Sequence, residues 1–409
     1  MTGAACGAIG RSMTDDPPFS PALLPAGFVD LLTPDARTEA EGVATLMGVF
    51  ASHGYDRVRP PLMEFEDTLL AGSGATLADQ SFRVMDPDTR KMMVLRPDIT
   101  PQIARMAATR LGAAARPLRL SYAGACVVVM PAAAEESGRQ IMQAGIELIG
   151  PDSPQADAEV MSVGAEALAQ LGVPDVSFDL TMPPLVPALL EEANISASVR
   201  PVLMRALDRK DAAAVAELGG VLVAELGGVL AETLIALLRA AGPAEQALEQ
   251  LAHISLPPRA RAFSERLAAT VAALRKTNPS LRLTVDPVEF RGWKYHTGVC
   301  VTVFAVGRAE ELGRGGRYRS NDNEPASGLT FRPDVLFRTI PPAQARQRVY
   351  LAPDADAQSA ARLRAEGHAT LAALPSGAPH LTGPEHDRAE ALRLGCSHIL
   401  SGATCTKLD

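Results

Sequence analysis

Residues 141–150 form an apolar segment with two polar side chains that could hold a ligand. Gln143 and Glu147 lie in the run IMQAGIELIG. Every second residue of a β-strand faces the same side, so Gln143, Gly145 and Glu147 share one face. Polar side chains on a buried strand are costly unless they meet a polar partner. An exposed sheet edge would account for them without a ligand, but their apolar neighbours favour a buried strand. We therefore expect a ligand on this face.

A second concentration of polar and aromatic groups lies in residues 286–318. Four such side chains stand before its apolar run: Arg291, Trp293, Tyr295 and His296. The run itself, 299–306, predicts a strand buried on both faces. The glycine-rich segment GRGGRY, 313–318, follows it and predicts a turn. Such groups at both ends of a strand suit a small-molecule pocket. A hairpin with a packed tryptophan and a snorkelling arginine fits equally well.

The segment LRPDIT, 95–100, contains a third set of polar side chains, which lies just before a predicted helix. Pro101 suits the first turn of that helix, which we expect to run to about Leu111. Asp98 and Thr100 would then lie near its N-terminus, where the helix dipole favours an anion. A plain N-cap explains the same residues.

Periodicity and turn signals predict the helices and strands in which these residues lie. We expect an α+β fold with helices at 35–53, 101–111 and 157–171 and a hairpin at 81–85 and 92–95. Strands are expected at 55–62, 118–122, 126–130, 141–150, 176–180, 281–285 and 299–306, and a final strand and helix at 326–337. Pro60-Pro61 places the first strand at an edge or an interface.

The composition of the chain changes along its length and predicts its domain organisation. We expect a flexible lead-in at 1–20, a core formed by 21–182 and 280–342, a helical insertion at 183–279 and a small α/β domain at 346–409. The insertion contains a tandem VAELGGVL, at 215–222 and 223–230. Its eight-residue period does not make a solenoid.

The charge balance and the cysteines exclude several functional classes. The net charge is −8, which gives no general attraction for nucleic acid. Five cysteines without a CxxC pair fit a reduced cytosolic protein better than a disulfide framework or a zinc site. No segment approaches a membrane span, and the first residues lack the apolar region of a signal peptide. We therefore expect a cytoplasmic protein without metal or cofactor.

The order of these segments resembles the catalytic core of class II aminoacyl-tRNA synthetases, and the histidyl-tRNA synthetase family most closely. The resemblance rests on five segments: LRPDIT (95–100), GRQIMQAGIELIG (138–150), RGWKYHTG (291–298), GRGGRY (313–318) and SGLTF (327–331). It implies an antiparallel sheet flanked by helices, a helical insertion, and dimerisation through the segment that ends at Pro60-Pro61. The occurrence of all five segments in this order is more specific than any single motif.

The resemblance also implies a histidine pocket. Its residues would be Asp98, Gln143, Glu147, Arg291, Tyr295 and His296. Arg291 would lie beside the ligand carboxylate. His296 stands where the family has the second of two tyrosines, so the contact to the imidazole ring is altered.

The adenylation residues of that family are not matched. The second-motif arginine that grips the ATP α-phosphate falls on Val128, and the third-motif arginine falls on Val335. Adenylyl transfer depends on positioned cations. Arg332 is the nearest charge that could compensate.

A retained amino-acid pocket without these arginines, and with a short C-terminal tail, resembles one branch of the family. This branch comprises regulatory subunits that accompany a short catalytic ATP phosphoribosyltransferase in histidine biosynthesis. The resemblance implies a non-catalytic chain in a hetero-oligomer, with histidine as feedback ligand. An active histidyl-tRNA synthetase and a free-standing amino-acid sensor remain alternatives.

Overall fold

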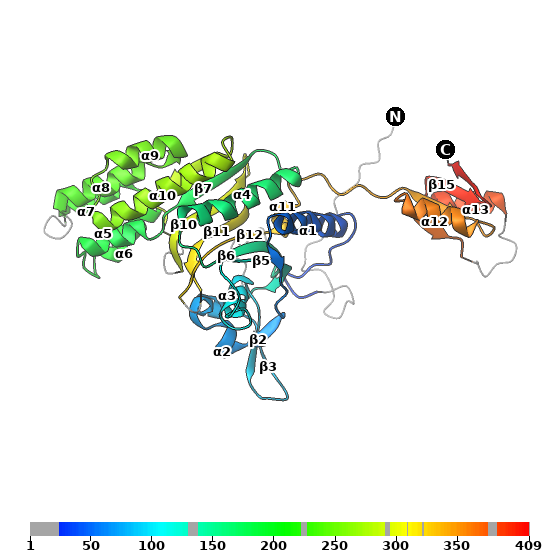
Figure 1. Cartoon of the computed structure of the whole chain (residues 1–409), viewed down its shortest axis with the longest axis horizontal. Helices are drawn as coiled ribbons and strands as arrows, with labels where there is room; N and C mark the ends of the chain where they lie inside the picture. Colours follow the sequence, from blue (N-terminus) through cyan, green and yellow to red (C-terminus); the bar gives the residue numbers. More distant parts are fainter. Residues whose placement is uncertain are drawn as a thin grey trace. The chain divides into compact units, whose positions relative to one another are not determined.

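The computed structural model describes residues 24–129, 138–221, 227–290, 295–308, 310–320, 323–374 and 383–408. The chain divides into two compact units at Pro341-Pro342 (Figure 1). The expected lead-in at 1–20, Arg291, Trp293 and part of the tandem repeat lie outside the described residues. In the described part of the chain, no helix is both long enough and apolar enough to cross a membrane.

A nine-stranded sheet organises the first unit, with strand order β1-β5-β6-β12-β11-β10-β7-β9-β8. The strands are β1 (Asp56–Arg57), β5 (Leu118–Val127), β6 (Gln140–Ile149), β7 (Val176–Thr181), β8 (Gly242–Pro243), β9 (Arg282–Asp286), β10 (His296–Ala305), β11 (Glu311–Arg319) and β12 (Pro325–Phe331). The pairings from β5 to β7 are antiparallel. Two pairings nearer the edges, β1 with β5 and β7 with β9, are parallel. The expected antiparallel core is therefore part of a mixed sheet.

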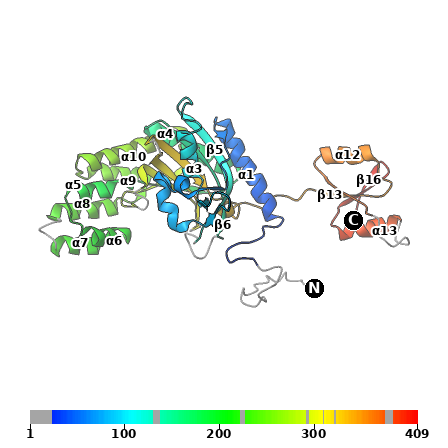
Figure 2. The same ribbon diagram turned by 90° about the horizontal axis from the view of Figure 1, so that it is seen from below.

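Helices cover the two faces of this sheet differently (Figure 2). One face packs in the main core against α1 (Asp35–Ser52), α4 (Pro154–Gln170) and α10 (Pro258–Thr277). The other packs against α3 (Thr100–Ala108) in a separate apolar cluster. Strand β6 shows the division, because Ala144, Ile146 and Leu148 face the main core. Gln143 and Glu147 therefore face the α3 side, as the two-residue period predicts.

The helical insertion connects β7 with β9. Its helices are α5 (Leu185–Glu192), α6 (Arg200–Asp208), α7 (Ala212–Val221), α8 (Gly227–Arg239), α9 (Ala244–His253) and α10. They gather beside the β7 end of the sheet (Figure 1). Their buried leucines belong to the same core as the sheet, so this insertion is packed onto the unit.

The predicted turn at 313–318 is wrong, because these residues lie inside strand β11. The glycines serve close packing between strands. A Cβ on Gly313 would lie 2.7 Å from the Thr330 carbonyl oxygen, and one on Gly315 would overlap the Gly328 carbonyl. Glycine in a strand often marks such a close approach of backbones.

Three further strand predictions need correction. The strands expected at 118–122 and 126–130 belong to one strand, β5, which ends at Val127, and residue 130 lies outside the described residues. Gly124 continues the strand at a place where a Cβ would overlap the Arg96 guanidinium. The strand expected at 55–62 shortens to β1, a two-residue edge strand. Pro60 and Pro61 remove ladder donors and end it. A separate strand, β2 (Met63–Phe65), follows.

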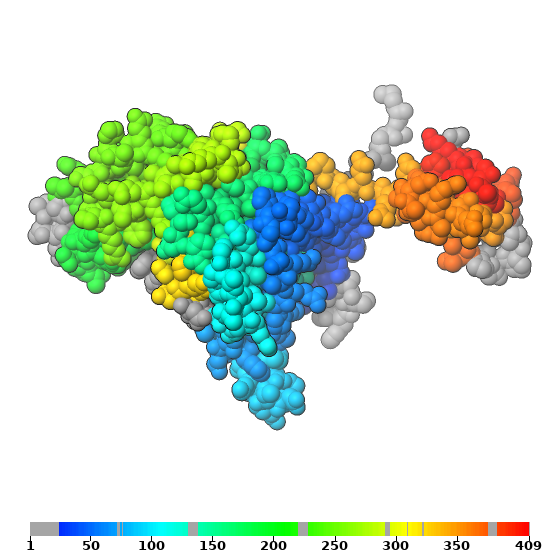
Figure 3. Space-filling view, viewed as in Figure 1, coloured from blue at the N-terminus to red at the C-terminus, as the bar shows by residue number. Residues whose placement is uncertain are grey.

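A small three-stranded sheet projects from the unit near the β3 label (Figures 1 and 3). Its order is β2-β4-β3, where β3 (Arg83–Met85) and β4 (Met92–Leu95) form the predicted hairpin. Short helical segments α2 (Glu66–Leu69) and η1 (Gly72–Gln80) connect β2 with β3. The chain then passes from β4 directly through Asp98 into α3, so this sheet anchors one wall of the site described below.

The second unit is a four-stranded sheet with order β14-β13-β15-β16. Its elements are β13 (Arg348–Leu351), α12 (Ala357–Ala365), β14 (Ala369–Ala372), α13 (Pro384–Arg393), β15 (His398–Ser401) and β16 (Thr404–Lys407). Strand β16 is exposed along its whole length and lacks a buried period. Helix α11 (Pro333–Leu336) ends the first unit before the linker.

Candidate functional site

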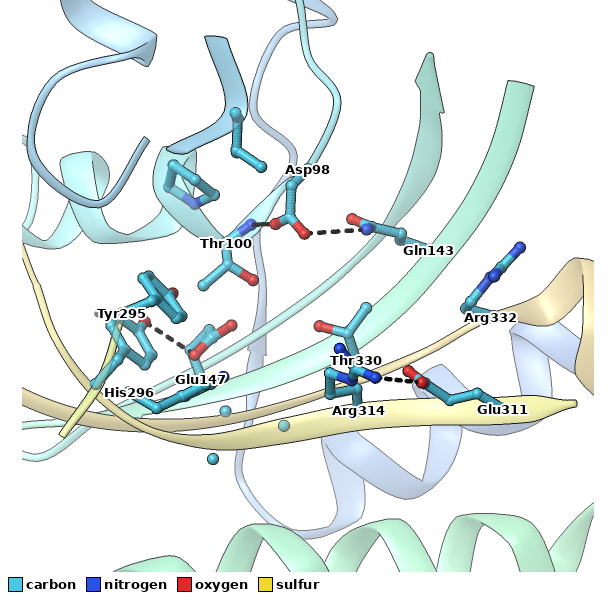
Figure 4. A pocket seen from close by; sticks show the side chains of 16 residues that line it. Asp98, Thr100, Gln143, Glu147, Tyr295, His296, Glu311, Arg314, Thr330 and Arg332 are labelled. Atoms are coloured by element: carbon cyan, nitrogen blue, oxygen red, sulfur yellow. Dashed lines mark hydrogen bonds and ion pairs between the residues drawn. The ribbon is translucent and has the colours of Figure 1, made fainter. Parts of the chain in front are cut away.

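A cavity of about 340 Å³ opens on the α3 side of the large sheet (Figure 4). Strands β6, β10, β11 and β12 form its floor, and the segment that leads into α3 forms its roof. The lining residues are Leu77, Asp98, Thr100, Pro101, Gln143, Glu147, Tyr295, His296, Glu311, Arg314, Gly315, Gly316, Tyr318, Gly328, Thr330 and Arg332. This size and this mixture of aromatic and polar groups suit a small molecule.

Hydrogen bonds fix the orientation of Asp98 and Gln143. The Gln143 Oε1 accepts the Ile99 N–H at 3.0 Å and the Cys126 thiol at 3.3 Å. The Gln143 Nε2 must therefore face Asp98, and it donates to the Asp98 Oδ2 at 3.2 Å. The Asp98 Oδ1 accepts the Thr100 N–H at 2.7 Å, so Asp98 also satisfies a free N–H in the first turn of α3. The N-cap residue of α3 is Ile99, so Asp98 supports the start of the helix from the preceding position and also lines the cavity.

Glu147 is a buried carboxyl group held by two tyrosines. Its Oε2 accepts the Tyr318 hydroxyl at 2.9 Å, and its Oε1 accepts the Tyr122 hydroxyl at 3.4 Å. Burial raises the pKa of Glu147 to about 8, although the Tyr318 hydrogen bond opposes that shift. At neutral pH Glu147 is therefore largely protonated and uncharged.

The register of the sheet makes room for this carboxyl group. Glu147 pairs with Gly328 on β12, and Gly328 pairs with Gly316 on β11. A Cβ on Gly328 would overlap the Glu147 carboxylate. In the next row, Thr330 hydrogen-bonds to the Tyr122 hydroxyl at 2.6 Å. The missing side chain of Gly328 therefore leaves the space that the Glu147 carboxyl group occupies.

Aromatic rings form one end of the cavity (Figure 4). Tyr295 stacks on Tyr318 with ring centroids 5.3 Å apart, and it meets His296 edge-on at 4.8 Å. Burial lowers the pKa of His296 to about 4. His296 is therefore neutral at physiological pH, and this end of the cavity carries no cation from the described residues.

The opposite end of the cavity is charged but internally neutralised. In the described part of the chain, Arg314 and Arg332 are the cations that line it. Arg314 pairs with Glu311 at 2.7 Å, and Arg332 pairs with Asp334 at 3.0 Å. Arg332, the residue that could compensate for the missing arginines, is thus already engaged by a carboxylate.

The two valines at the adenylation positions contribute no charge to this site. Val128 is buried beside β5 and forms a bridge with Ser81. Val335 is buried in α11 within the main core. Neither valine lines the cavity, so the positions that should grip a nucleotide are occupied by core side chains.

A buried ion pair lies behind the cavity on the same strand, β11. Arg317 donates to the Asp157 carboxylate at 2.8 Å, and the two side chains are 3% and 1% exposed. Ser327 also donates to Asp157. Because side chains alternate along a strand, Arg317 binds α4 while its neighbours Gly316 and Tyr318 face the cavity. The strand therefore joins the core and the site.

The structure brings together every ligand residue that sequence analysis predicted within the described ranges, namely Asp98, Gln143, Glu147, Tyr295 and His296. Arg291 lies outside the described residues. Sequence analysis missed Tyr122 and Thr330 and gave Tyr318 no role, although these residues hold Glu147 or its tyrosine partner. Their only sequence signal is a hydroxyl on a buried strand, which cannot identify a partner on another strand.

Metal binding finds no support in the described ranges. They contain no group of three or more histidine, cysteine or acidic side chains arranged to hold a metal ion. Cys126, Cys300 and Cys396 are buried free thiols, and Cys405 is an exposed one.

A family model described as histidyl-tRNA synthetase matches residues 27–336. An ATP phosphoribosyltransferase regulatory subunit from Gluconobacter oxydans is 54% identical over 380 residues, which cover 93% of this chain and 96% of that protein.

Two solved structures share the fold. An ATP phosphoribosyltransferase regulatory subunit/histidyl-tRNA synthetase from Bacillus halodurans superposes with a TM-score of 0.80 at 23% identity, covering 95% of this chain and 99% of that one. A chain of the ATP phosphoribosyl transferase (HisG:HisZ) complex from Thermotoga maritima gives a TM-score of 0.57 at 15% identity, covering 72% of this chain and 97% of that one.

The fold and the family match together define a protein of the histidyl-tRNA synthetase class. Within that class, the chain belongs to the family of ATP phosphoribosyltransferase regulatory subunits.

Proposed function

We propose that this regulatory subunit binds histidine in the cavity and reports its presence to a short catalytic ATP phosphoribosyltransferase. The observation that carries this proposal is the convergence of Asp98, Gln143 and Glu147 on one cavity of amino-acid size. The alternatives are weaker. A working synthetase would need nucleotide cations, whereas Val128 and Val335 are buried and uncharged.

The arrangement suggests one orientation of the ligand. The α-ammonium group lies between the carboxyl groups of Asp98 and Glu147, where it donates hydrogen bonds to both and favours the ionised form of each. The imidazole ring enters the aromatic end beside Tyr295 and His296. The resemblance supplies Arg291 for the ligand carboxylate, as a charge-assisted and bidentate contact.

The assembly of this chain with a catalytic subunit and its location in the cell are inferred from its family, not from the cavity. A relative of this chain is named as the regulatory subunit of ATP phosphoribosyltransferase, and a structure with the same fold contains a two-component complex. We infer that this chain likewise pairs with a catalytic subunit in the cytoplasm, and that it dimerises through the segment ending at Pro60-Pro61. Histidine regulates such an assembly only by binding its two states with different affinity.

Binding of histidine is expected to release a proton from Glu147. The pKa of Glu147 is raised to about 8 in the empty cavity, and an adjacent ammonium favours the carboxylate. Affinity should therefore rise with pH up to about pH 8. Among the described residues, the other cavity groups that act on Glu147 are Asp98, Thr100, Tyr122, Tyr295 and Tyr318, and none of the hydroxyls titrates in this range.

Isothermal titration at pH 7.5 in phosphate and in Tris measures this release, because the two buffers take up protons with different enthalpies. The wild-type chain should show a buffer-dependent enthalpy. Glu147→Gln, which cannot ionise, should show nearly equal enthalpies in both buffers. Equal enthalpies for the wild-type chain in the two buffers would show that Glu147 does not hold the ligand ammonium. If histidine gave no binding heat in either buffer, the proposed function itself would be overturned.

A further inference from the structure

The ring of His296 has a fixed hydrogen-bonding polarity. Its Nδ1 lies 3.4 Å from the Arg317 carbonyl oxygen. A carbonyl oxygen only accepts hydrogen bonds, so the proton must be on Nδ1. Burial, and to a lesser extent the positive charge of Arg314, lowers the pKa of His296 to about 4. The ring is therefore neutral, and a neutral imidazole carries one N–H.

The second nitrogen of His296 is consequently an acceptor. With Nδ1 committed to strand β11, Nε2 has no proton and is the ring nitrogen available to the cavity that His296 lines. Figure 4 places this ring at the aromatic end, near Tyr295 and Glu147 and away from Glu311 and Arg332. The edge-on contact with Tyr295 restricts the ring plane.

The carbonyl that orients His296 is itself well held. It belongs to Arg317, whose side chain is anchored by Asp157 at 2.8 Å, by the Pro151 carbonyl at 3.1 Å and by the Ser153 carbonyl at 3.2 Å. The backbone that selects the Nδ1–H form of His296 is thus tied to the N-terminus of α4. A hydrogen bond from one ring nitrogen to a backbone carbonyl commonly fixes a histidine tautomer in this way.

We propose that His296 is a specificity residue that accepts a hydrogen bond from a ring N–H of the ligand. A tyrosine hydroxyl at this place could donate or accept, whereas His296 only accepts. The cavity therefore selects a heteroaromatic amino acid with a ring N–H and discriminates against an isostere without one. This inference rests on the proposed binding of histidine and specifies how the side chain of the ligand is read.

The test compares two ligands by calorimetric titration of the full chain: L-histidine and β-(thiazol-4-yl)-L-alanine, whose ring keeps one nitrogen but has sulfur in place of the N–H. The wild-type chain should prefer histidine by about 10- to 100-fold, because the thiazole leaves Nε2 without a donor in a buried site. In His296→Leu the preference should fall to about threefold or less. His296→Gln, whose amide oxygen can accept, should regain part of it.

A general loosening of the cavity would weaken the binding of both ligands and leave the ratio of their affinities nearly unchanged. Thermal unfolding confirms that each variant is folded. Equal affinity of the wild-type chain for both ligands, or an undiminished preference in His296→Leu, would overturn this inference while leaving histidine binding intact. A wild-type chain that binds neither ligand would overturn the proposed function and this inference with it.

Discussion

Replacing Asp98 with asparagine should weaken histidine binding by about 100-fold, since truncating one partner of a buried charged contact typically costs about 2 to 5 kcal/mol. The side chain keeps its size but loses the charge that holds the ligand ammonium. The substitution also removes one of the two acceptor oxygens that Gln143 and the Thr100 N–H use. Gln143 must present Nε2 because Ile99 and Cys126 occupy its Oε1. An asparagine oxygen can serve Gln143 or the Thr100 N–H, but not both.

Glu311→Gln is the matched control for this experiment. It removes the same charge from a residue that lines the same cavity, but at the end where Glu311 pairs with Arg314. Titration calorimetry should show an affinity for histidine within about threefold of the wild-type value, because an exposed pair contributes little. If the two variants lost affinity equally, the ammonium would not be held specifically at Asp98.

Replacing Asp157 with asparagine should destabilise the first unit by about 3 to 5 kcal/mol, the usual cost of leaving one partner of a buried ion pair uncompensated. Asp157 is 1% exposed and holds Arg317, which is 3% exposed. The introduced asparagine can keep its oxygen toward Arg317, which contacts Oδ1. It loses the negative charge, and its amide N–H groups would then face the Arg266 guanidinium, which contacts Oδ2. The expected loss is a large fraction of the stability of a typical domain.

Urea unfolding followed by far-ultraviolet circular dichroism measures this loss in the transition of the larger unit. Asp152→Asn provides the comparison, because Asp152 contacts Arg266 and Arg317 but is 44% exposed. Its loss should stay within about 1 kcal/mol. A cost for Asp157→Asn no greater than that of Asp152→Asn would show that the buried pair is not a major source of stability.

The period of β6 could be read from sequence because it is a local property. Apolar residues at 144, 146 and 148 face the main core, which leaves Gln143 and Glu147 on the other side. The same local reasoning identified α1, α4 and the hairpin β3–β4. It succeeded wherever a single element and its own neighbours determine the outcome.

The sequence could not predict the environment of Glu147, because that environment comes from other strands. Tyr122 on β5 and Tyr318 on β11 reach it only through the register of a nine-stranded sheet. The glycines of GRGGRY were misinterpreted for the same reason. They are typical of a turn locally, and only the approach of the Gly328 and Thr330 carbonyls explains them inside a strand.

Strand β11 gives the proposed sensor a physical connection between ligand and core. Arg317 points to α4 while Tyr318 holds Glu147. A change in the ionisation of Glu147 on ligand binding therefore acts on a strand anchored by the buried ion pair. This contiguity makes β11 a candidate route for the signal, and coupling must be measured to establish it.

We propose that this chain senses an amino acid without activating it. The most direct measurement is the phosphoribosyltransferase activity of the catalytic subunit co-purified with this chain, recorded against L-histidine concentration for the wild type and for Asp98→Asn. We predict equal activities without histidine, inhibition of the wild-type complex, and a requirement for about 100-fold more histidine with the variant. Identical inhibition curves for the two complexes would contradict a regulatory role for this cavity.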